Sequence, residues 1–386
     1  MADILEDALA VLDRLVAFDT TSRNSNLALI EWVEAYLAAR GVRAHRVANA
    51  DGGKANLIAI VGPVAPGGIV LSGHTDVVPV DGQPWTSDPW HVTQRADRLF
   101  GRGVADMKGF LALSLASVAP ALRANLKRPL ILAFSYDEEI GCLGAPSLIA
   151  ALPDLAPAPA LAIVGEPTDM RVLSGHKGIR NFGVEVIGRE AHSSQAGQGV
   201  SAIAEAVPLM ALVLEMAREA AANADPASLF TPPGPTMTVG LVEGGTAGNI
   251  LARRCWFQWD LRTATLAEAD HYEARFRAAA AEADARIKAL APEGGVSVER
   301  RSNTPPFSPD LDSAAERFVR SLTGDNAVQA ASFAAEAGLF QHAGIPTVLC
   351  GPGSIAQAHQ PDEWIALSQM AEGAAFMEKL LARLGD

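Results

Sequence analysis

The sequence predicts an α/β protein with a largely parallel central sheet that is interrupted by a smaller inserted α+β domain. Short apolar runs alternate with helical stretches over residues 1–178, which is the order expected of a parallel sheet covered by helices. After residue 178 the order changes to strand, helix, two strands, helix and strand, as in a split βαβ sandwich. An apolar strand at 345–350 then resumes the first pattern, so the middle segment is an insertion.

The first part of the chain is expected to begin with two helices. Apolar residues at helical spacing predict a helix over residues 4–16, and a second helix is expected over 26–40, ending at Gly41. A later helix is expected over 110–122, between two strands. Buried strands are predicted at 57–61, 69–71, 129–136 and 161–164.

The inserted segment is expected to contain four strands and two long helices. Its first helix is predicted over 200–222, where Pro208 indicates either a kink or a later start. The other expected elements are strands at 181–187, 236–242, 254–261 and 296–300, with a helix at 266–290. A closing helix at 363–384 follows the last core strand. The predicted domains are therefore a main domain formed by 1–178 and 301–386, and the insert, 179–300.

Composition and charge exclude several classes of protein. Acidic residues outnumber basic ones by 44 to 31, for a formal net charge of −13. Nucleic acid and anionic membrane surfaces are negatively charged and bind proteins with an excess of basic residues. No apolar run reaches the roughly 18 residues of a membrane-spanning helix, and the first residues are acidic where a signal peptide would be basic. The 3 cysteines are too few for a disulfide framework. We therefore expect a cytoplasmic enzyme or binding protein.

Histidines and acids recur at the ends of successive predicted strands, where ligands gather in open α/β sheets. Each has a simple alternative explanation: Asp106 alone would be a helix N-cap, and His74 alone a buried histidine bonded to Asp76. Together they indicate neighbouring sites of mixed nitrogen and oxygen ligands, which suit zinc, cobalt or manganese better than calcium. The candidates are His74, Asp76, Asp106, Asp137, Glu138, Glu139, Glu166 and His359.

The motifs around these residues resemble the dinuclear M20 metallopeptidase and deacylase family, in order and over nearly the whole chain. The resemblance implies a zinc-aminopeptidase-like catalytic domain and an inserted ferredoxin-like dimerisation or lid domain. A tract over 337–363 is most similar to a branch that removes acetyl groups from N-acetylated amino acids. The family motifs match at residues 74–76, 103–109, 137–139, 165–167 and 358–359.

The resemblance also implies two divalent metal ions, Zn²⁺ or Co²⁺, and assigns their ligands. One ion would be bound by His74, Asp106 and Glu166. The other would be bound by Asp106, Glu139 and His359, so that Asp106 bridges the two. Such ions acidify a water molecule and polarise a carbonyl group, which is the chemistry that amide hydrolysis needs.

Glu138 falls at the general-base position of the family, and Asp76 lies behind His74. Spacing alone leaves it open which of Glu138 and Glu139 is the base and which is the ligand. A carboxylate in the base position can accept a proton from water and pass it to the departing amine.

The inserted domain is expected, from the resemblance, to form a homodimer and to contribute two substrate contacts across it. His192 would stabilise the oxyanion of the reaction, and Asn249 would contact the substrate. Considered without the family, His192 would be an exposed turn histidine.

Three further residues are candidates for substrate binding. Lys177 and Arg262 would hold a substrate carboxylate or would be surface cations. Glu336 would bind a substrate ammonium group, or else would cap a helix or pair with a nearby cation. The deacetylase branch carries Thr-Glu-Ala here, and Ala335 replaces the threonine.

The expected partner is a small N-acyl amino acid, with no nucleic acid or membrane partner. Two alternatives stay open. One is another acylase of the same family, and the other is an inactive member retained for dimerisation or binding. The metal-site positions are all intact, which argues against the second alternative.

Overall fold

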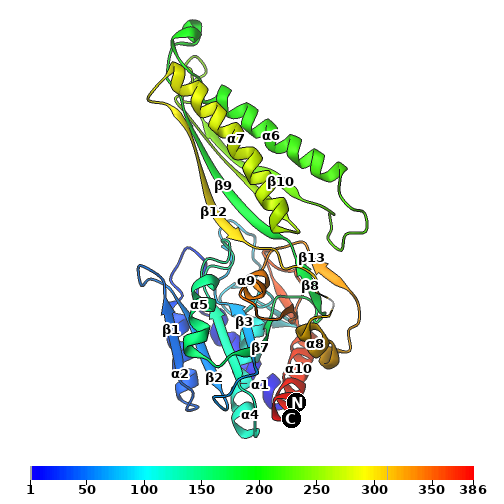
Figure 1. The fold of residues 1–386 in the computed structure, drawn as a ribbon. Helices are drawn as coiled ribbons and strands as arrows, with labels where there is room; N and C mark the ends of the chain where they lie inside the picture. The colour runs from blue at the N-terminus through cyan, green and yellow to red at the C-terminus, as the bar shows by residue number, and fades with distance from the viewer. Residues whose placement is uncertain (1, 311) are drawn as a thin grey trace. The chain divides into compact units, whose positions relative to one another are not determined.

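The computed structural model describes residues 2–310 and 312–386. The chain forms two compact units, which we call the core unit and the inserted unit. Both termini belong to the core unit (Figure 1). The core unit comprises the chain up to Gly175 with Pro309–Ala330 and Ala335–Asp386, and the inserted unit comprises His176–Ser308 with Ala331–Ala334.

The core unit is built on an eight-stranded mixed sheet with strand order β1-β2-β6-β3-β7-β14-β8-β13. Its centre is parallel, because β3 pairs in parallel with β6 and β7, and β7 with β14. Every residue of β3 and β6 is buried, as expected of strands covered on both faces. The strands are β1 (Ala44–Ala48), β2 (Ala55–Val61), β3 (Gly68–His74), β6 (Leu130–Ser135), β7 (Pro159–Val164), β8 (Leu173–His176), β13 (Gln329–Ala331) and β14 (Thr347–Leu349).

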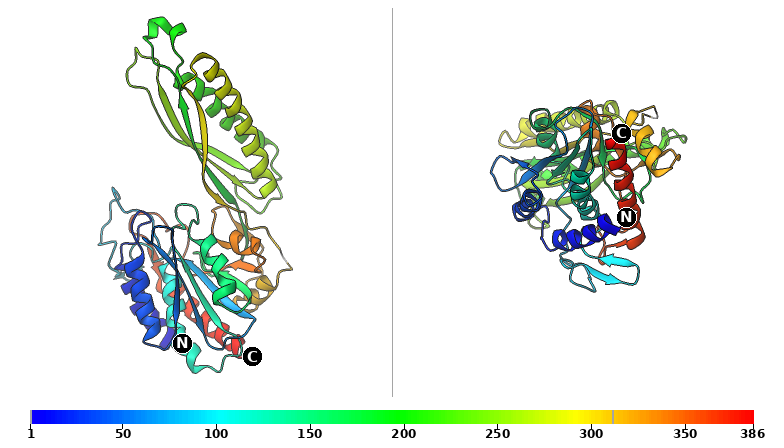
Figure 2. Two further views of the ribbon diagram at one scale, coloured as in Figure 1. Left: turned by 60° about the vertical axis from the view of Figure 1, so that its left-hand side comes forward. Right: turned by 90° about the horizontal axis from the view of Figure 1, so that it is seen from below.

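Helices cover both faces of this sheet (Figure 2). One face forms a continuous apolar core with six helices: α1 (Ala2–Val16), α2 (Leu27–Ala38), α3 (Lys108–Ala116), α4 (Val118–Arg123), α8 (Ala314–Thr323) and α10 (Leu367–Gly385). The other face contacts α5 (Ala145–Leu155) and α9 (Ala337–His342). A three-stranded sheet of β4 (Thr93–Arg95), β5 (Arg98–Phe100) and β15 (Trp364–Ala366) joins the C-terminal segment to the chain ahead of α3.

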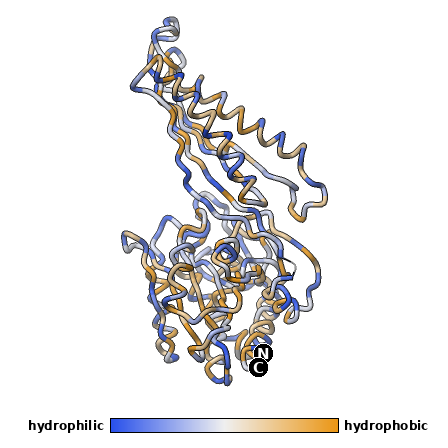
Figure 3. Tube along the Cα trace, viewed as in Figure 1, coloured by the Kyte–Doolittle hydropathy of each residue, from blue (hydrophilic) through white to orange (hydrophobic). Residues whose placement is uncertain are grey.

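The inserted unit is a four-stranded antiparallel sheet of order β10-β11-β9-β12, with α6 and α7 on it. This strand order, with the chain order β-α-β-β-α-β, is ferredoxin-like. Residues of alternating hydropathy run along both helices (Figure 3), and their apolar sides pack on the sheet. The elements are β9 (Gly178–Ile187), α6 (Ala202–Ala222), β10 (Thr236–Gly244), β11 (Arg254–Thr263), α7 (Leu266–Leu290) and β12 (Gly295–Thr304), with a short 3-10 helix, η1 (Ser193–Gln198).

The core of the inserted unit is aromatic. Trp259 stacks on Phe182 with ring centroids 4.5 Å apart and lies 4.7 Å from Phe276. Thr265 and Glu268 form a reciprocal capping box at the start of α7, so this helix begins where its sequence signals place it. These contacts make the insert a unit with a core of its own.

The two ends of the insert are joined by backbone hydrogen bonds. The His176 N–H donates to the Phe307 carbonyl, the Phe307 N–H donates to the His176 carbonyl, and both N···O distances are 3.0 Å. Gly178 lies beside this pair, and a Cβ atom there would come within 2.6 Å of the Pro306 nitrogen. The two ends of the segment His176–Ser308 therefore lie together, while Ala331–Ala334 joins the same unit from later in the chain.

The predicted fold class is confirmed, and the structure corrects several details. The helix expected over 110–122 is two helices, α3 and α4, which meet at Ser117. A later start at Pro208 is wrong, because α6 begins at Ala202, where the Ser201 hydroxyl caps it. β12 continues to Thr304, which pairs with Ile179, so the inserted unit extends beyond residue 300. Among the described residues, no helix combines the length and apolar character needed to cross a membrane.

Candidate metal centre

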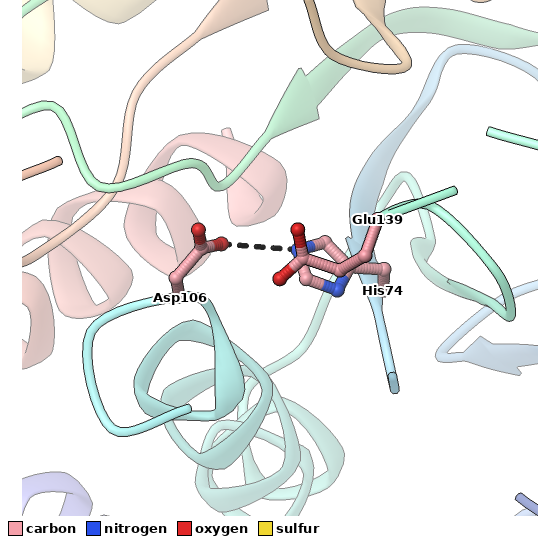
Figure 4. Close-up of side chains that lie close together, drawn as sticks. All are labelled: His74, Asp106 and Glu139. Carbon is pink, nitrogen blue, oxygen red and sulfur yellow. Dashed lines mark hydrogen bonds and ion pairs between the residues drawn. The ribbon is translucent and has the colours of Figure 1, made fainter. Parts of the chain in front are cut away.

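Three side chains converge at the carboxyl edge of the central sheet (Figure 4). They are His74 at the end of β3, Asp106 just before α3 and Glu139 after β6, and their candidate ligand atoms all lie within 4.8 Å of one another. β3 and β6 are parallel neighbours, so the segments that follow them meet at one edge. The sequence expectation that residues far apart in the chain meet at this edge holds for these three.

Asp106 lies between two imidazoles. Its Oδ1 is 3.1 Å from Nε2 of His74, and its Oδ2 is 3.4 Å from Nε2 of His359. Nε2 of His359 is also 2.9 Å from Oε2 of Glu139. Each oxygen of Asp106 thus faces a different histidine, which is the geometry that a carboxylate bridging two metal ions requires.

Glu166 brings further negative charge to the same place. It follows β7, is 4 % exposed, and its Oε1 has no hydrogen-bond partner among the described residues. Burial raises the pKa of Glu166 well above its usual value, and the charge of Asp106 raises it further. A buried carboxylate oxygen without a donor is costly unless a cation neutralises it, and the surrounding nitrogen and oxygen ligands fit a divalent transition metal.

The pKa values of the other candidate ligands also indicate that this site attracts positive charge. Burial alone would raise the pKa of Asp106, but hydrogen bonds with His359 and His74 hold it below its usual range. Burial raises the pKa of Glu139 to about 7. Hydrogen bonds with Asp106 and then Glu139 raise the pKa of His359 to about 10. Metal ions bound here would compete with these protons, because candidate ligands must lose their protons on binding.

Asp76 holds the loop that carries Glu138 and Glu139 as well as lying behind His74. Its Oδ1 accepts from the Glu138 N–H at 3.0 Å, and its Oδ2 accepts from the Glu139 N–H at 3.3 Å and from the Ser22 hydroxyl at 2.7 Å. Nδ1 of His74 is 2.9 Å from the backbone carbonyl of Asp76 but 3.6 Å from its carboxylate. Sequence reasoning missed Ser22, which lies 54 residues away without a spacing signal.

The three consecutive acids after β6 have different surroundings. Asp137 forms an ion pair with Lys54, and its φ of 55° turns the chain. Glu138 is partly buried, and its Oε1 accepts from the Cys142 thiol at 3.4 Å. Burial raises the pKa of Glu138 well above its usual value. Of the three, Glu139 directly contacts His359, whereas Glu138 forms a hydrogen bond with Cys142.

Glu336 is fully buried behind the same edge. It accepts hydrogen bonds from the hydroxyls of Ser135 on β6 and Ser72 on β3, the latter at 3.2 Å. Its side chain makes no helix-capping hydrogen bond to α9, which it precedes. Burial raises the pKa of Glu336, although the hydrogen bond from Ser135 opposes this shift.

In the inserted unit, His192 and Asn249 lie on adjacent segments. The Ser193 N–H donates to the Asn249 carbonyl at 2.9 Å, and His192 and Ile250 form an isolated β-bridge. His192 is exposed, and its Nδ1 accepts from the Ser194 N–H at 3.2 Å. In the neutral ring this places the proton on Nε2, which makes Nε2 the donor.

Lys177 and Arg262 are both engaged within the inserted unit. Nζ of Lys177 is buried and donates to the Pro232 and Gly234 carbonyls at 2.7 and 2.6 Å. Arg262 is half-exposed and pairs with Asp260 at 3.3 Å. Lys177 therefore anchors the loop around residues 231–235, and Arg262 retains exposed donors.

A largely parallel sheet that presents clustered carboxylates and two histidines at its carboxyl edge defines a metallohydrolase type of site. Comparison with known families makes this specific, because the sequence profile of peptidase family M20/M25/M40 matches residues 70–383. The chain belongs to this family, and it is a hydrolase acting on an amide bond.

The chain is similar over nearly its full length to curated acetylornithine deacetylases. The enzyme of Myxococcus xanthus is 34% identical, covering 99% of this chain and 98% of the relative. That of Proteus mirabilis (strain HI4320) is 33% identical, covering 95% of this chain and 92% of the relative.

Solved structures share the fold at lower identity. An M20 family metallo-carboxypeptidase from Sulfolobus solfataricus has a TM-score of 0.76 at 19% identity, covering 98% of this chain and 99% of that one. A dinuclear metal-binding M20 peptidase from Bacillus subtilis has a TM-score of 0.63 at 14% identity, covering 99% and 98%.

Proposed function

We propose that this protein is a metal-dependent deacetylase that hydrolyses N2-acetyl-L-ornithine to L-ornithine and acetate in arginine biosynthesis. The full-length similarity to acetylornithine deacetylases supports the substrate. The position of Asp106 between His74 and His359 carries the proposed chemistry, because it suits a pair of divalent ions.

The ligand assignment follows the contacts in the core unit. His74, Asp106 and Glu166 would hold one ion, and Asp106, Glu139 and His359 the other. Bound ions, Zn²⁺ or Co²⁺ in this proposal, would polarise the amide carbonyl and make a water molecule more acidic. The chain's own residues orient these ligands and move the proton.

Glu138 is the proposed general base. It stands next to Glu139 on the loop held by Asp76, and its pKa is raised, which suits a group that takes and returns a proton near neutral pH. It would accept a proton from water and deliver it to the leaving amine of ornithine. Asp76 fixes the backbone from which Glu138 projects.

The inserted unit is proposed to form a homodimer and to donate His192 to the partner's active site. Exposed apolar side chains support an interface there: Ile203, Val207 and Leu214 on α6, with Leu241 and Val242 on the edge strand β10. Nε2–H of His192 would stabilise the oxyanion, and Asn249, on the adjacent segment, would contact the substrate. The proposed location of the enzyme is the cytoplasm.

Glu336, Lys177 and Arg262 remain proposed substrate contacts. Glu336 would select the ammonium group of ornithine from its position beside the metal centre. Lys177 or Arg262 would hold the substrate carboxylate, and Arg262 has the more exposed guanidinium group.

The test is a substrate panel assayed after chelation, with and without added Zn²⁺ or Co²⁺. We expect chelation to abolish turnover, added metal to restore it, and acetylornithine to have the highest kcat/KM. Preference for succinyl-diaminopimelate or acetylmethionine would instead support another acylase of the family, an alternative that Ala335 in place of the branch's threonine favours. Full activity in metal-free protein would contradict the proposal.

A further inference from the structure

Arg102 and Glu363 form a buried ion pair between the two segments that carry Asp106 and His359. Both residues are 1% exposed, and Nη1 of Arg102 lies 2.8 Å from Oε2 of Glu363. Burying two charges is expensive, and such a pair is best explained where it specifies one arrangement of the chain. Neither residue is a candidate metal ligand.

The carboxylate of Glu363 is enclosed by the backbone that leads to Asp106. Its Oε2 accepts from the Gly103 N–H at 3.0 Å, and its Oε1 accepts from the N–H groups of Ala105 and Asp106 at 2.9 and 3.1 Å. The Gly101 N–H also donates to the Glu363 backbone carbonyl at 3.0 Å. A concave run of backbone N–H groups around one carboxylate fixes the path of that segment, including the residue that faces both histidines.

Arg102 connects the same carboxylate to the segment of His359. Its guanidinium donates to the Gln360 carbonyl at 3.3 Å and to the side-chain oxygen of Gln83. The side-chain amide of Gln83 in turn donates to the His359 carbonyl at 2.9 Å. A continuous set of hydrogen bonds therefore runs from the backbone of Asp106 to the backbone of His359.

We infer that Glu363 and Arg102 are positioning residues that set the separation of Asp106 and His359 and thereby the affinity for the ion these two share with Glu139. This inference rests on the proposed metal-dependent function. The pair acts through the backbone of the ligands and contacts neither the substrate nor the reacting atoms.

Replacing Glu363 with Gln tests the role with little change in volume. A carboxylate has two acceptor oxygens, whereas an amide has one acceptor and one donor group. In E363Q an NH₂ group must face either the N–H groups of Ala105 and Asp106 or those of Gly103 and Arg102. In both orientations, the hydrogen bonds that one carboxylate oxygen accepts in the parent are lost.

A matched control is available in the same unit. Glu316 on α8 is also a buried carboxylate, with a side chain 3% exposed, and it pairs with Arg320 at 3.1 Å. E316Q removes a comparable charge without contacting the segments of Asp106 or His359. A loss of thermal stability that both variants share therefore comes from removing a buried charge, and not from displacing Asp106 or His359.

The experiment measures Zn²⁺ bound per chain by equilibrium dialysis over a range of free Zn²⁺, with thermal unfolding of each variant recorded in parallel. We expect E363Q to bind one of the two equivalents about tenfold or more weakly, as is usual for groups that orient metal ligands, while E316Q binds both as the parent does. Saturating Zn²⁺ should restore most of the kcat of E363Q. A folded E363Q with the parent's binding curve would overturn the inference, and so would equal weakening in E316Q.

A second variant covers the case in which E363Q does not fold. Q83L removes the partly exposed link to the His359 carbonyl and leaves the Arg102–Glu363 pair in place. We expect a smaller weakening that again affects one of the two equivalents, and unchanged binding in Q83L would overturn the inference. If the parent binds two ions but does not act on acetylornithine, the proposed substrate fails while this inference stands; a parent that binds fewer than two ions overturns both.

Discussion

The metal centre of the core unit and the His192–Asn249 segments of the inserted unit are built in opposite ways. His74, Asp106 and Glu166 are buried, and charged hydrogen bonds orient the first two. His192 and Asn249 are exposed, and backbone pairing joins their segments, while the ring of His192 contacts only Ser194 among the described residues.

The two regions therefore hold their candidate functional side chains in different ways. The core unit orients its candidate ligands through a sheet edge and dense hydrogen bonding, so we expect the replacement of a candidate ligand to affect metal binding and folding together. The inserted unit fixes only the ring orientation of His192 and leaves Nε2 available for another molecule. A change at His192 should therefore affect the reaction and spare the fold.

The largest expected effect separates base from ligand within the core unit. E138Q should keep its metal and its thermal stability but lose about a hundredfold to ten-thousandfold in kcat, because the amide cannot accept a proton. E139Q should lose metal first. Metal analysis and kinetics on both variants check this, and the reverse pattern would exchange the roles of Glu138 and Glu139.

The second prediction concerns the proposed catalytic role of His192 in the inserted unit. H192A should lose about 3 kcal/mol of transition-state stabilisation, the usual value for one oxyanion donor, with unchanged metal content and melting temperature. Mixing H192A with E138Q chains should restore activity, because a heterodimer then contains one complete site. Verified heterodimers without activity would place His192 in its own subunit's site or outside catalysis.

The third prediction asks whether Glu336, which is fully buried, also determines substrate specificity. If it attracts the ornithine ammonium group, E336Q should lose about 1.5–3 kcal/mol in kcat/KM for acetylornithine and much less for acetylmethionine. If its hydrogen bonds to Ser72 and Ser135 serve only the fold, both substrates should lose activity equally or the protein should melt earlier. The ratio of the two kcat/KM values decides between these roles.

The smallest expected effect concerns Ser22. S22A removes one hydrogen bond to the Asp76 carboxylate, and we expect it to lower the free energy of unfolding by about 1–2 kcal/mol. The Glu138 and Glu139 N–H groups would remain bonded to Asp76, so kcat should change little. Denaturant unfolding and kinetics on the metal-loaded enzyme measure the two effects, and a large loss of kcat at full stability would show that Ser22 supports the base directly.

The sequence predicts which side chains meet at the edge of the sheet better than it predicts which residues hold them there. Residues such as His74 and Glu166 are recognisable because each directly follows an apolar strand whose end is itself predictable. Glu363 contacts Gly103 across 260 residues, and no periodicity records such a contact. The short strands β8 and β13 were likewise missed, since three or four residues are too few to show a pattern.

The residue types also left the direction of some side chains undetermined. A strand pattern places Asp76 on the same side as His74, but the carboxylate could orient the imidazole or bond to a neighbouring loop. In the structure its shortest contacts are with Ser22 and the Glu138 N–H. This choice depends on how the chain turns after β6, where Asp137 has a positive φ.

The hydrogen-bonded pair of His176 and Phe307 has a consequence for how this architecture can diversify. Because the two ends of the segment His176–Ser308 lie together, most of the insert is one continuous segment that begins and ends at one place in the fold. Its strands can lengthen or its helices can acquire new outer faces while the His176–Phe307 hydrogen bonds stay as they are. Changes of this kind can thus leave the clustered side chains of the core unit, His74, Asp106 and Glu139, in place.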